Sequence, residues 1–279
     1  MLSVSLGPLV LSTHHLLLLL ALASALLAGW VSGRSQQVNP ERALFRLFLI
    51  ALVVSRIAFV AEYWTHYQSS ALSIVDIRDG GFMIWPGLVA LLAGTAIHAW
   101  RRPALRRSVT IALASGLTLW GLGNLTLNAL QEDVRLPDLT VRNAAGETVH
   151  LRDYEGKKLV INLWATWCPP CRREMPVLQA AQRASPDTVF LFVNQGENPE
   201  DIQTFLARQA LHLDNNLFDR TGELARHVGS AALPTTLFYQ PDGRFAGSHM
   251  GELSTASLTH YLNSLDDTSA ASPIPRSTP

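Results

Sequence analysis

The sequence predicts two parts of different fold class: an all-α bundle of four transmembrane helices, followed by an α/β domain. Apolar stretches long enough to cross a bilayer as helices, which takes about 20 residues, are confined to residues 1–131. In residues 132–268, short runs of β-prone residues alternate with helical patterns. The end of the chain, residues 269–279, is rich in Ser, Pro and Thr, which predicts a disordered tail.

Length and charge set the outer limits of the interpretation. A chain of 279 residues has room for about two domains. Its 22 basic and 22 acidic residues balance to a net charge of zero. Since proteins that bind nucleic acid need an excess of positive charge, we expect no nucleic-acid partner.

Four apolar stretches in the first part are expected to span a lipid bilayer. The first resembles a secretory signal peptide in its position, but no Lys or Arg precedes it and its first positive charge, Arg34, follows it. A signal peptide carries its positive charge in front, so we interpret this stretch as a retained helix. The expected spans are Leu9–Val31, Leu44–Trp64, Gly81–Trp100 and Val109–Leu130.

Positive charges between these spans predict their orientation. The first loop carries Arg34 and Arg42, whereas the second offers only Arg78 beside two aspartates. The third loop is the most basic, and cytoplasmic loops carry an excess of Lys and Arg. We therefore expect both termini and the α/β domain in the periplasm, with the protein in a bacterial inner membrane. The charges of the third loop are Arg101, Arg102, Arg106 and Arg107.

The two cysteines of the chain, Cys168 and Cys171, lie between an apolar strand-like run and a helical pattern. Unpaired N–H groups and the dipole at the start of a helix stabilise a thiolate, so Cys168 is a candidate nucleophile. Cys171, about one turn later, is placed to resolve a mixed disulfide. Pro169 and Pro170 suit the first helical turn. The predicted chemistry is dithiol–disulfide exchange.

Half of a zinc site is the alternative interpretation of a Cys-x-x-Cys sequence. Zinc takes four ligands, and the chain has no second cysteine pair. None of the nine histidines has a ligand-like spacing near the cysteines. We therefore expect no metal and no cofactor.

Strands and helices of the second part follow from local patterns. Two short strands surround the turn at residues 143–146, and a nearly continuous apolar run predicts a buried strand directly before the cysteines. Pro176 predicts a kink in the helix that follows. The expected strands are Leu139–Val141, Thr148–Leu151, Lys158–Trp164, Thr188–Asn194, Thr235–Tyr239 and Arg244–Met250. The expected helices run from Cys168 to Ala184, and over Pro199–Ala210, Glu223–Val228 and Ser254–Leu265, with Ser254 as an N-cap.

This order of elements, with Cys-x-x-Cys at the start of the first helix, resembles the thioredoxin fold. The sequence is most similar to the TlpA/ResA/CcmG-like branch of membrane-anchored thiol-disulfide oxidoreductases, over residues 136–265. The motifs that carry the resemblance are Pro137-Asp138, the segment Leu151 to Lys157, the segment Asn162 to Pro176, and Leu233-Pro234-Thr235-Thr236.

The resemblance implies roles for residues beyond the cysteines. Pro234 matches a cis-proline that faces the disulfide, which would let the backbone of Leu233 pair with a substrate; an ordinary trans proline is the alternative. Glu174 matches an acidic residue that lies near the active site and tunes the thiols. A carboxylate close to Cys171 is suited to accept its proton; the alternative is a first-turn acid that favours the helix dipole. Asn162 replaces a buried aspartate of thioredoxin. The residues expected around the site are Trp167, Pro169, Pro170, Leu233 and Thr235.

By the same resemblance, the protein would reduce disulfides of periplasmic proteins. Among these would be the disulfide that the thiols of apocytochrome c form when they are oxidised. A membrane protein like DsbD or CcdA would keep it reduced, because the membrane part contains no cysteine of its own. An oxidising or isomerising role is the alternative, since the direction depends on the reduction potential.

Residues 44–102 resemble part of the prolipoprotein diacylglyceryl transferase family. The similarity lies in the segment Ser55 to Val60 and the segment Gly80 to Gly87. The histidine of the family is replaced here by Trp85 or Pro86, so we expect the transferase chemistry to be lost; a lipid-modifying enzyme is the alternative. Arg56 is a candidate functional residue, because an ionisable group inside a membrane span needs a specific reason.

Overall fold

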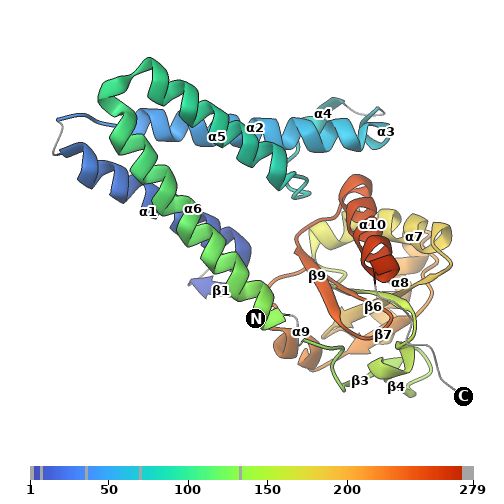
Figure 1. Ribbon diagram of the computed structural model, residues 1–279. Helices are drawn as coiled ribbons and strands as arrows, with labels where there is room; N and C mark the ends of the chain where they lie inside the picture. The colour runs from blue at the N-terminus through green and yellow to red at the C-terminus, as the bar shows by residue number, and fades with distance from the viewer. Residues whose placement is uncertain (1–2, 7–8, 35–36, 69–70, 132–133, 272–279) are drawn as a thin grey trace, which may run out of the picture. The chain divides into compact units, whose positions relative to one another are not determined.

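The computed structural model describes residues 3–6, 9–34, 37–68, 71–131 and 134–271. The chain forms two compact units (Figure 1). The helical unit contains Thr13–Ile77 and Gly81–Ala129, and the sheet unit contains Met1–Ser12, Arg78–Gly80 and Leu130–Pro279.

In its described residues, the helical unit has four long helices and two short ones. Among the described residues, α1, α2 and α6 are long and apolar enough to cross a membrane. The remaining expected span is helix α5, which has 18 residues and is polar at its end, where His98 and Arg101 lie. The number of four spans therefore stays a prediction. The helices are α1 (Thr13–Arg34), α2 (Glu41–Glu62), α3 (Trp64–Tyr67), α4 (Ala71–Val75), α5 (Ile84–Arg101) and α6 (Pro103–Gln131).

Two boundaries of the helical unit differ from those expected. Helix α1 begins at Thr13, because the preceding residues form an antiparallel hairpin of β1 (Ser3–Leu6) and β2 (Leu9–Ser12). Helix α6 begins at Pro103, a residue suited to the first helical position. As a result, Arg106 and Arg107 belong to the start of a helix and not to a loop.

The sheet unit is built on a seven-stranded sheet of order β4-β3-β7-β6-β5-β8-β9. Strand β5 lies inside it, parallel to β6 and antiparallel to β8. Its side chains alternate between two cores: Val160 and Trp164 face one, and Leu159 and Ile161 face the other. The strands are β3 (Thr140–Asn143), β4 (Thr148–His150), β5 (Lys158–Trp164), β6 (Thr188–Gln195), β7 (Asn216–Asp219), β8 (Thr235–Tyr239) and β9 (Phe245–Met250).

Helices cover both faces of this sheet, as expected for a thioredoxin-like domain (Figure 1). Residues of α7, α8 and α10 contribute to the core with Trp164, and residues of α9 contribute to the opposite core. The helices are α7 (Pro169–Ala184), α8 (Pro199–Arg208), α9 (Glu223–Val228) and α10 (Thr255–Ala271), with a 3₁₀ turn, η1, at Leu151–Tyr154.

Most elements of this unit were predicted, and three have the expected bounds: β5, α9 and β8. Strand β7 was not predicted. Ser254 caps α10 as expected, because its Oγ accepts the N–H of Ser257 at 3.1 Å. Helix α10 continues to Ala271, past the point where the disordered tail was expected to begin. Residues 272–279 lie outside the described residues.

Two short segments from the first half of the chain belong to the sheet unit. The backbone N–H of Ser3 donates to the carbonyl of Gly229 at 3.1 Å. The hydroxyl of Ser257 donates to the carbonyl of Asp79 at 2.7 Å. The sheet unit therefore includes residues that precede α1 and residues that lie between α4 and α5.

Candidate active site

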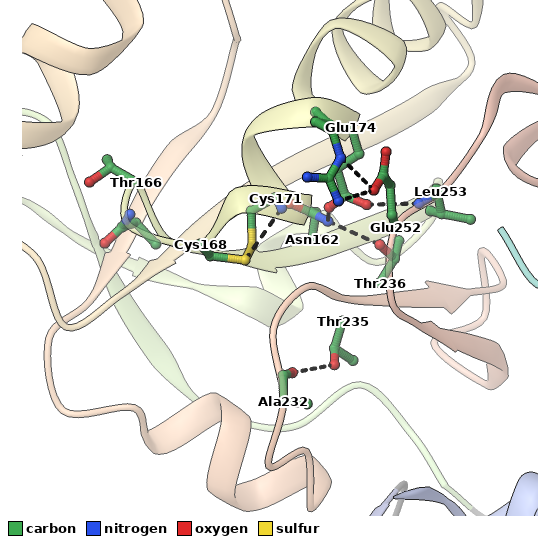
Figure 2. The surroundings of a disulfide bond; sticks show 12 residues. Asn162, Thr166, Cys168, Cys171, Glu174, Ala232, Thr235, Thr236, Glu252 and Leu253 are labelled. Atoms are coloured by element: carbon green, nitrogen blue, oxygen red, sulfur yellow. Dashed lines mark hydrogen bonds and ion pairs between the residues drawn. A yellow bond between two sulfur atoms is a disulfide. The ribbon is translucent and has the colours of Figure 1, made fainter. Parts of the chain in front are cut away.

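The cysteine pair lies where β5 ends and α7 begins (Figure 2). The N–H of Cys168 donates to the carbonyl of Ala165 at 3.3 Å, so the chain turns tightly between the two elements. Cys168 is the N-cap of α7, and Pro169 and Pro170 occupy its first positions. Proline needs no hydrogen-bond acceptor there, so this sequence starts a helix with no unpaired N–H at those two positions.

Cys168 and Cys171 are joined by a disulfide, with their Cα atoms 5.3 Å apart. The N–H of Cys171 points at Cys168 Sγ over 3.3 Å. This is an interaction that stabilises a thiolate at a helix N-terminus. Cys168 is 3% exposed and Cys171 is completely buried. The geometry therefore fits an attacking sulfur at residue 168 and an internal sulfur at residue 171.

Glu174, one turn after Cys171, is completely buried. Its Oε1 accepts a hydrogen bond from Asn162 Nδ2 at 2.8 Å, and its Oε2 accepts the N–H of Leu253 at 3.0 Å (Figure 2). Burial raises the pKa of the Glu174 carboxyl to about 8, although these two hydrogen bonds act in the opposite direction. The side chain can therefore change its protonation state close to neutral pH.

Asn162 holds the buried carboxylate to the sheet. It lies on β5 opposite Thr236 of β8, and its Nδ2 donates both to Glu174 and to Thr236 Oγ1, the latter at 3.0 Å. An amide at this position supplies donors and adds no second charge. Glu174 is thus the one carboxylate in this hydrogen-bonded group of three.

The Leu233–Pro234 peptide bond is cis, as the resemblance implied. Pro234 is buried and Leu233 is half-buried. Thr235 is buried directly after them, and its hydroxyl donates to the carbonyl of Ala232 at 2.8 Å (Figure 2). These contacts fix the loop at the start of β8.

The two tryptophans around the cysteines have different surroundings. Trp164 is completely buried and packs against Phe205, with ring centroids 5.8 Å apart. Trp167, directly before Cys168, is 67% exposed. Pro169 is exposed and Pro170 is half-buried. Trp167 and Pro169 therefore supply the surface next to the disulfide.

Glu197 also belongs to this site and was not predicted from the sequence. Its carboxylate accepts the backbone N–H of Thr166 at 2.7 Å and also the hydroxyl of Thr166. Parallel pairing of β5 and β6 places Trp164 opposite Asn194, so the loops after both strands meet at one edge of the sheet. Polar residues that follow adjacent parallel strands were the signal that could have revealed it.

A polar hollow of about 480 Å³ lies beside this loop. Thr166, Arg172 and Glu197 contribute to its wall, together with residues of α8. In the described part of the chain, no group of three or more His, Cys, Asp or Glu side chains is arranged to hold a metal ion.

Arg56, the candidate in the helical unit, is buried on α2 with 7% of its surface exposed. Its guanidinium donates to four backbone carbonyls: Ile74 at 3.0 Å, Ser73 at 3.0 Å, Asp76 at 2.7 Å and Gly81 at 2.9 Å. These contacts fasten the segment after α3 to α2.

The two segments that resembled the diacylglyceryl transferase family meet around this arginine. Ser55 Oγ donates to the carbonyl of Met83 at 2.6 Å, next to the bond from Arg56 to Gly81. A Cβ atom on Gly81 would lie 2.5 Å from Arg56 Nη1 and from the ring of Phe59. A side chain at this position would therefore have to displace Arg56 or Phe59, which glycine avoids.

Comparison with known families divides the chain in the same way. Residues 133–246 match the model of the AhpC/TSA family, and residues 2–127 match that of the prolipoprotein diacylglyceryl transferase family. The second match supports a membrane domain fused to the thioredoxin-like domain.

Several curated proteins are similar to this chain. The thioredoxin-like protein YneN of Bacillus subtilis is 26% identical over 162 residues, covering 56% of this chain and 94% of YneN. The thiol-disulfide oxidoreductase ResA of Bacillus subtilis is 25% identical over 167 residues, covering 58% of this chain and 93% of ResA. ResA of Oceanobacillus iheyensis is 30% identical over 135 residues, covering 46% of this chain and 70% of its own length.

Solved structures that match this chain include a secreted disulfide oxidoreductase of Mycobacterium tuberculosis, 24% identical, with a TM-score of 0.42. It covers 46% of this chain and 96% of its own length. The exposed lipoprotein thioredoxin of Streptococcus pneumoniae is 27% identical, covers 46% and 98%, and has a TM-score of 0.40. On the sequence evidence, this chain belongs, through its C-terminal domain, to the family of ResA-type thiol-disulfide oxidoreductases.

Proposed function

We propose that the protein is a membrane-anchored disulfide reductase of the periplasm. The observation that carries this proposal is the cysteine pair at the start of α7 with a buried carboxylate, Glu174, one turn further along the same helix. Residues three positions apart on a helix share one face, so Glu174 and Cys171 face the same core.

Reduction of a substrate proceeds in two exchange steps. The thiolate of Cys168 attacks one sulfur of the substrate disulfide, forming a mixed disulfide and releasing one substrate thiolate. Cys171 then loses its proton and attacks Cys168 Sγ. This step forms the Cys168–Cys171 disulfide and releases the second substrate sulfur as a thiolate, which then takes up a proton. The substrate gains two electrons, and the cysteine pair is oxidised.

Glu174 is the proton acceptor for Cys171 in the second step. A free thiol has a pKa of about 8.5, and burial brings the pKa of Glu174 to about 8. Proton transfer between groups of similar pKa costs little free energy, which is the condition for an effective general base. The hydrogen bond from Asn162 keeps the carboxylate in place as it gains and loses the proton.

Pro234 and Leu233 form the substrate clamp in this proposal. By resemblance to the family, the backbone of Leu233 pairs with a substrate strand that lies across the cysteines. Leu233 is half-buried, and the contact of Thr235 with Ala232 fixes the loop that carries it. Trp167, which is largely exposed, supplies an apolar surface for the same strand.

Electrons must come from another protein, because the chain contains only these two cysteines. We propose a membrane thiol donor of the DsbD or CcdA type. The substrates are disulfides of periplasmic proteins, including the heme-binding thiols of apocytochrome c after their oxidation.

Both termini lie in the periplasm in this proposal. Support comes from the distribution of basic residues between the spans. The segments that make up the sheet unit are consistent with this orientation, because residues 1–12, residues 78–80 and the C-terminal domain form one compact unit. Segments of one soluble unit must lie on the same side of a membrane.

The equilibrium reduction potential tests the direction of the reaction. The full chain in detergent is equilibrated with dithiothreitol or glutathione buffers, and the reduced fraction is measured by alkylation and mass spectrometry. A reductase requires a potential near or below about −250 mV, close to that of thioredoxin. A potential near about −120 mV, close to that of DsbA, would show instead that the protein donates disulfides.

For the helical unit we propose an anchor or partner-docking role without transferase activity. The similarity to the diacylglyceryl transferase family raises the alternative, a lipid-modifying enzyme. The guanidinium of Arg56 donates to four backbone carbonyls, so it is committed to holding the loop and not to a lipid headgroup. Transfer of diacylglycerol to a lipoprotein substrate by the purified full chain would overturn this part of the proposal.

A further inference from the structure

Glu197 connects the loop of the cysteines to the neighbouring strand. Thr166 lies two residues before Cys168, on the loop shown in Figure 2. Both of its polar groups donate to this one carboxylate: the backbone N–H to Oε2 at 2.7 Å, and the hydroxyl to Oε1. One side chain therefore satisfies the donors of Thr166 from outside the loop.

The carboxylate is itself held in place from β6. Asn194 Nδ2 donates to Glu197 Oε2 at 2.7 Å, and the N–H of Glu197 donates back to Asn194 Oδ1 at 3.3 Å. Gly196, between them, has a φ of +80°, a left-handed conformation that glycine adopts without strain. The turn directs Glu197 toward the end of β5, where Trp164 pairs with Asn194.

We propose that Glu197 is a positioning residue for thiol-disulfide exchange, which holds the loop before Cys168 so that its sulfur stays at the N-terminus of α7. The inference rests on the proposed role of Cys168 as the attacking sulfur. It does not depend on whether the protein reduces or oxidises its substrates.

The physical reason is that helix N–H groups stabilise a thiolate over a short distance only. The stabilisation acts within the first turn, and the N–H of Cys171 already points at Cys168 Sγ. If the loop loosens, the sulfur spends less time in this position and the thiolate becomes less stable. The negative charge of Glu197 alone would have the opposite effect, because a carboxylate disfavours a nearby thiolate. Removing only the charge would therefore make the Cys168 thiolate more stable. The sign of the effect therefore distinguishes positioning from electrostatics.

The test measures how fast iodoacetamide alkylates Cys168 between pH 5 and pH 9. The full chain in detergent is reduced, freed of reductant, and analysed by mass spectrometry of the peptide that contains Cys168. The variants are Glu197→Ala, Glu197→Gln and Thr166→Val. Glu200→Ala removes an exposed carboxylate three residues later and is the matched control.

For Glu197→Ala, we expect the pH midpoint of alkylation to rise by about one unit, with about tenfold slower alkylation below the midpoint. Glu197→Gln should give a smaller rise, because its amide oxygen still accepts one bond from Thr166. Thr166→Val, which loses the hydroxyl but keeps the N–H, should behave similarly. These two milder variants provide the measurement if Glu197→Ala does not fold.

Two results would overturn the inference. One is an unchanged midpoint in every Glu197 and Thr166 variant that folds, or a rise equal to that of Glu200→Ala. The other is a lower midpoint in both Glu197→Ala and Glu197→Gln, which would mean that the charge acts and the position does not. If the wild-type chain is alkylated first at Cys171 instead, the proposed role of Cys168 fails separately.

Discussion

Arg56 in the helical unit and Glu174 in the sheet unit are both ionisable and buried, yet their surroundings differ. Arg56 donates to four backbone carbonyls and has the rings of Phe59, Tyr67 and Phe82 within 6.0 Å of its guanidinium carbon. Glu174 is completely buried and, among the described residues, accepts two hydrogen bonds, from Asn162 and Leu253.

The difference shows how surroundings decide what a buried charge does. A carboxylate with two donors is poorly compensated for lost hydration, so burial raises its pKa toward the working range. A guanidinium with a carbonyl acceptor for most of its N–H groups holds the segments that carry those carbonyls together. This difference supports the proposed roles, proton transfer for Glu174 and loop fastening for Arg56.

The largest expected effect concerns the pH dependence of stability. The carboxyl of Glu174 has its ordinary pKa of 4.5 in the unfolded chain and about 8 in the folded chain. Between these values the folded chain keeps a proton that the unfolded chain releases, so stability falls as pH rises. Glu174→Gln has no such loss and should gain up to about 5 kcal/mol relative to wild type between pH 4 and pH 9.

Thermal or denaturant unfolding of the oxidised full chain at several pH values measures this difference. Glu223→Gln, which changes an exposed carboxylate at the start of α9, is the control and should follow the wild type. A constant difference between Glu174→Gln and wild type across this range would mean that the carboxyl is not neutral in the folded protein.

An intermediate effect is expected at the arginine. Arg56→Gln removes the donors of several carbonyls, which should favour opening of the segment after α3 by about 3 kcal/mol, or more than 100-fold in the opening equilibrium. Chymotrypsin cleavage at the exposed Leu72 measures this opening. Arg46→Gln, on the same helix but exposed, is the matched change. Equal cleavage of the two variants would show that Arg56 does not fasten the loop.

The smallest effect is kinetic. Glu174→Gln should slow turnover of a disulfide substrate about tenfold near pH 8, because Cys171 must lose its proton without a nearby base. The pH profile of the wild type should rise through about pH 8, and this rise should be missing in the variant. Arg56→Gln should leave the profile unchanged. If the pH profile is the same in wild type and Glu174→Gln, then water, and not Glu174, accepts the proton of Cys171.

Much of the sheet unit could be predicted because its local signals agree with its tertiary structure. The apolar run Lys158–Trp164 is a central strand with the expected bounds, and Ser254 is a helix cap. Strand β7 was missed because Asn216 and Asp219 are turn-forming residues, and only pairing with β6 and β3 makes this segment a strand. In the same way, apolar Leu9 was assigned to a helix, although it pairs with Leu6 in a hairpin.

The residues of the candidate site differ in the same way: those close together in the sequence could be predicted, and the distant one could not. Cys168, Cys171 and Glu174 lie within one short stretch, so their spacing on a helix was predictable from the sequence. Glu197 is 31 residues from Thr166 and reaches it only because β5 and β6 are parallel neighbours. A motif can show which residues share a helical turn, but strand order decides which distant loop supports them.

The place of β5 in the sheet has a thermodynamic consequence. Its residues pair with β6 on one side and β8 on the other, so its amide hydrogens should exchange with solvent only through global unfolding. Deuterium uptake at Ile161, in the strand that leads to the cysteines, then reports the unfolding free energy. The change in that free energy on reduction equals the difference in potential between the folded and unfolded dithiol, about 30 mV for each 1.4 kcal/mol. Isotope exchange in this one strand thus measures how strongly folding biases the cysteines toward donating electrons, with no partner protein present.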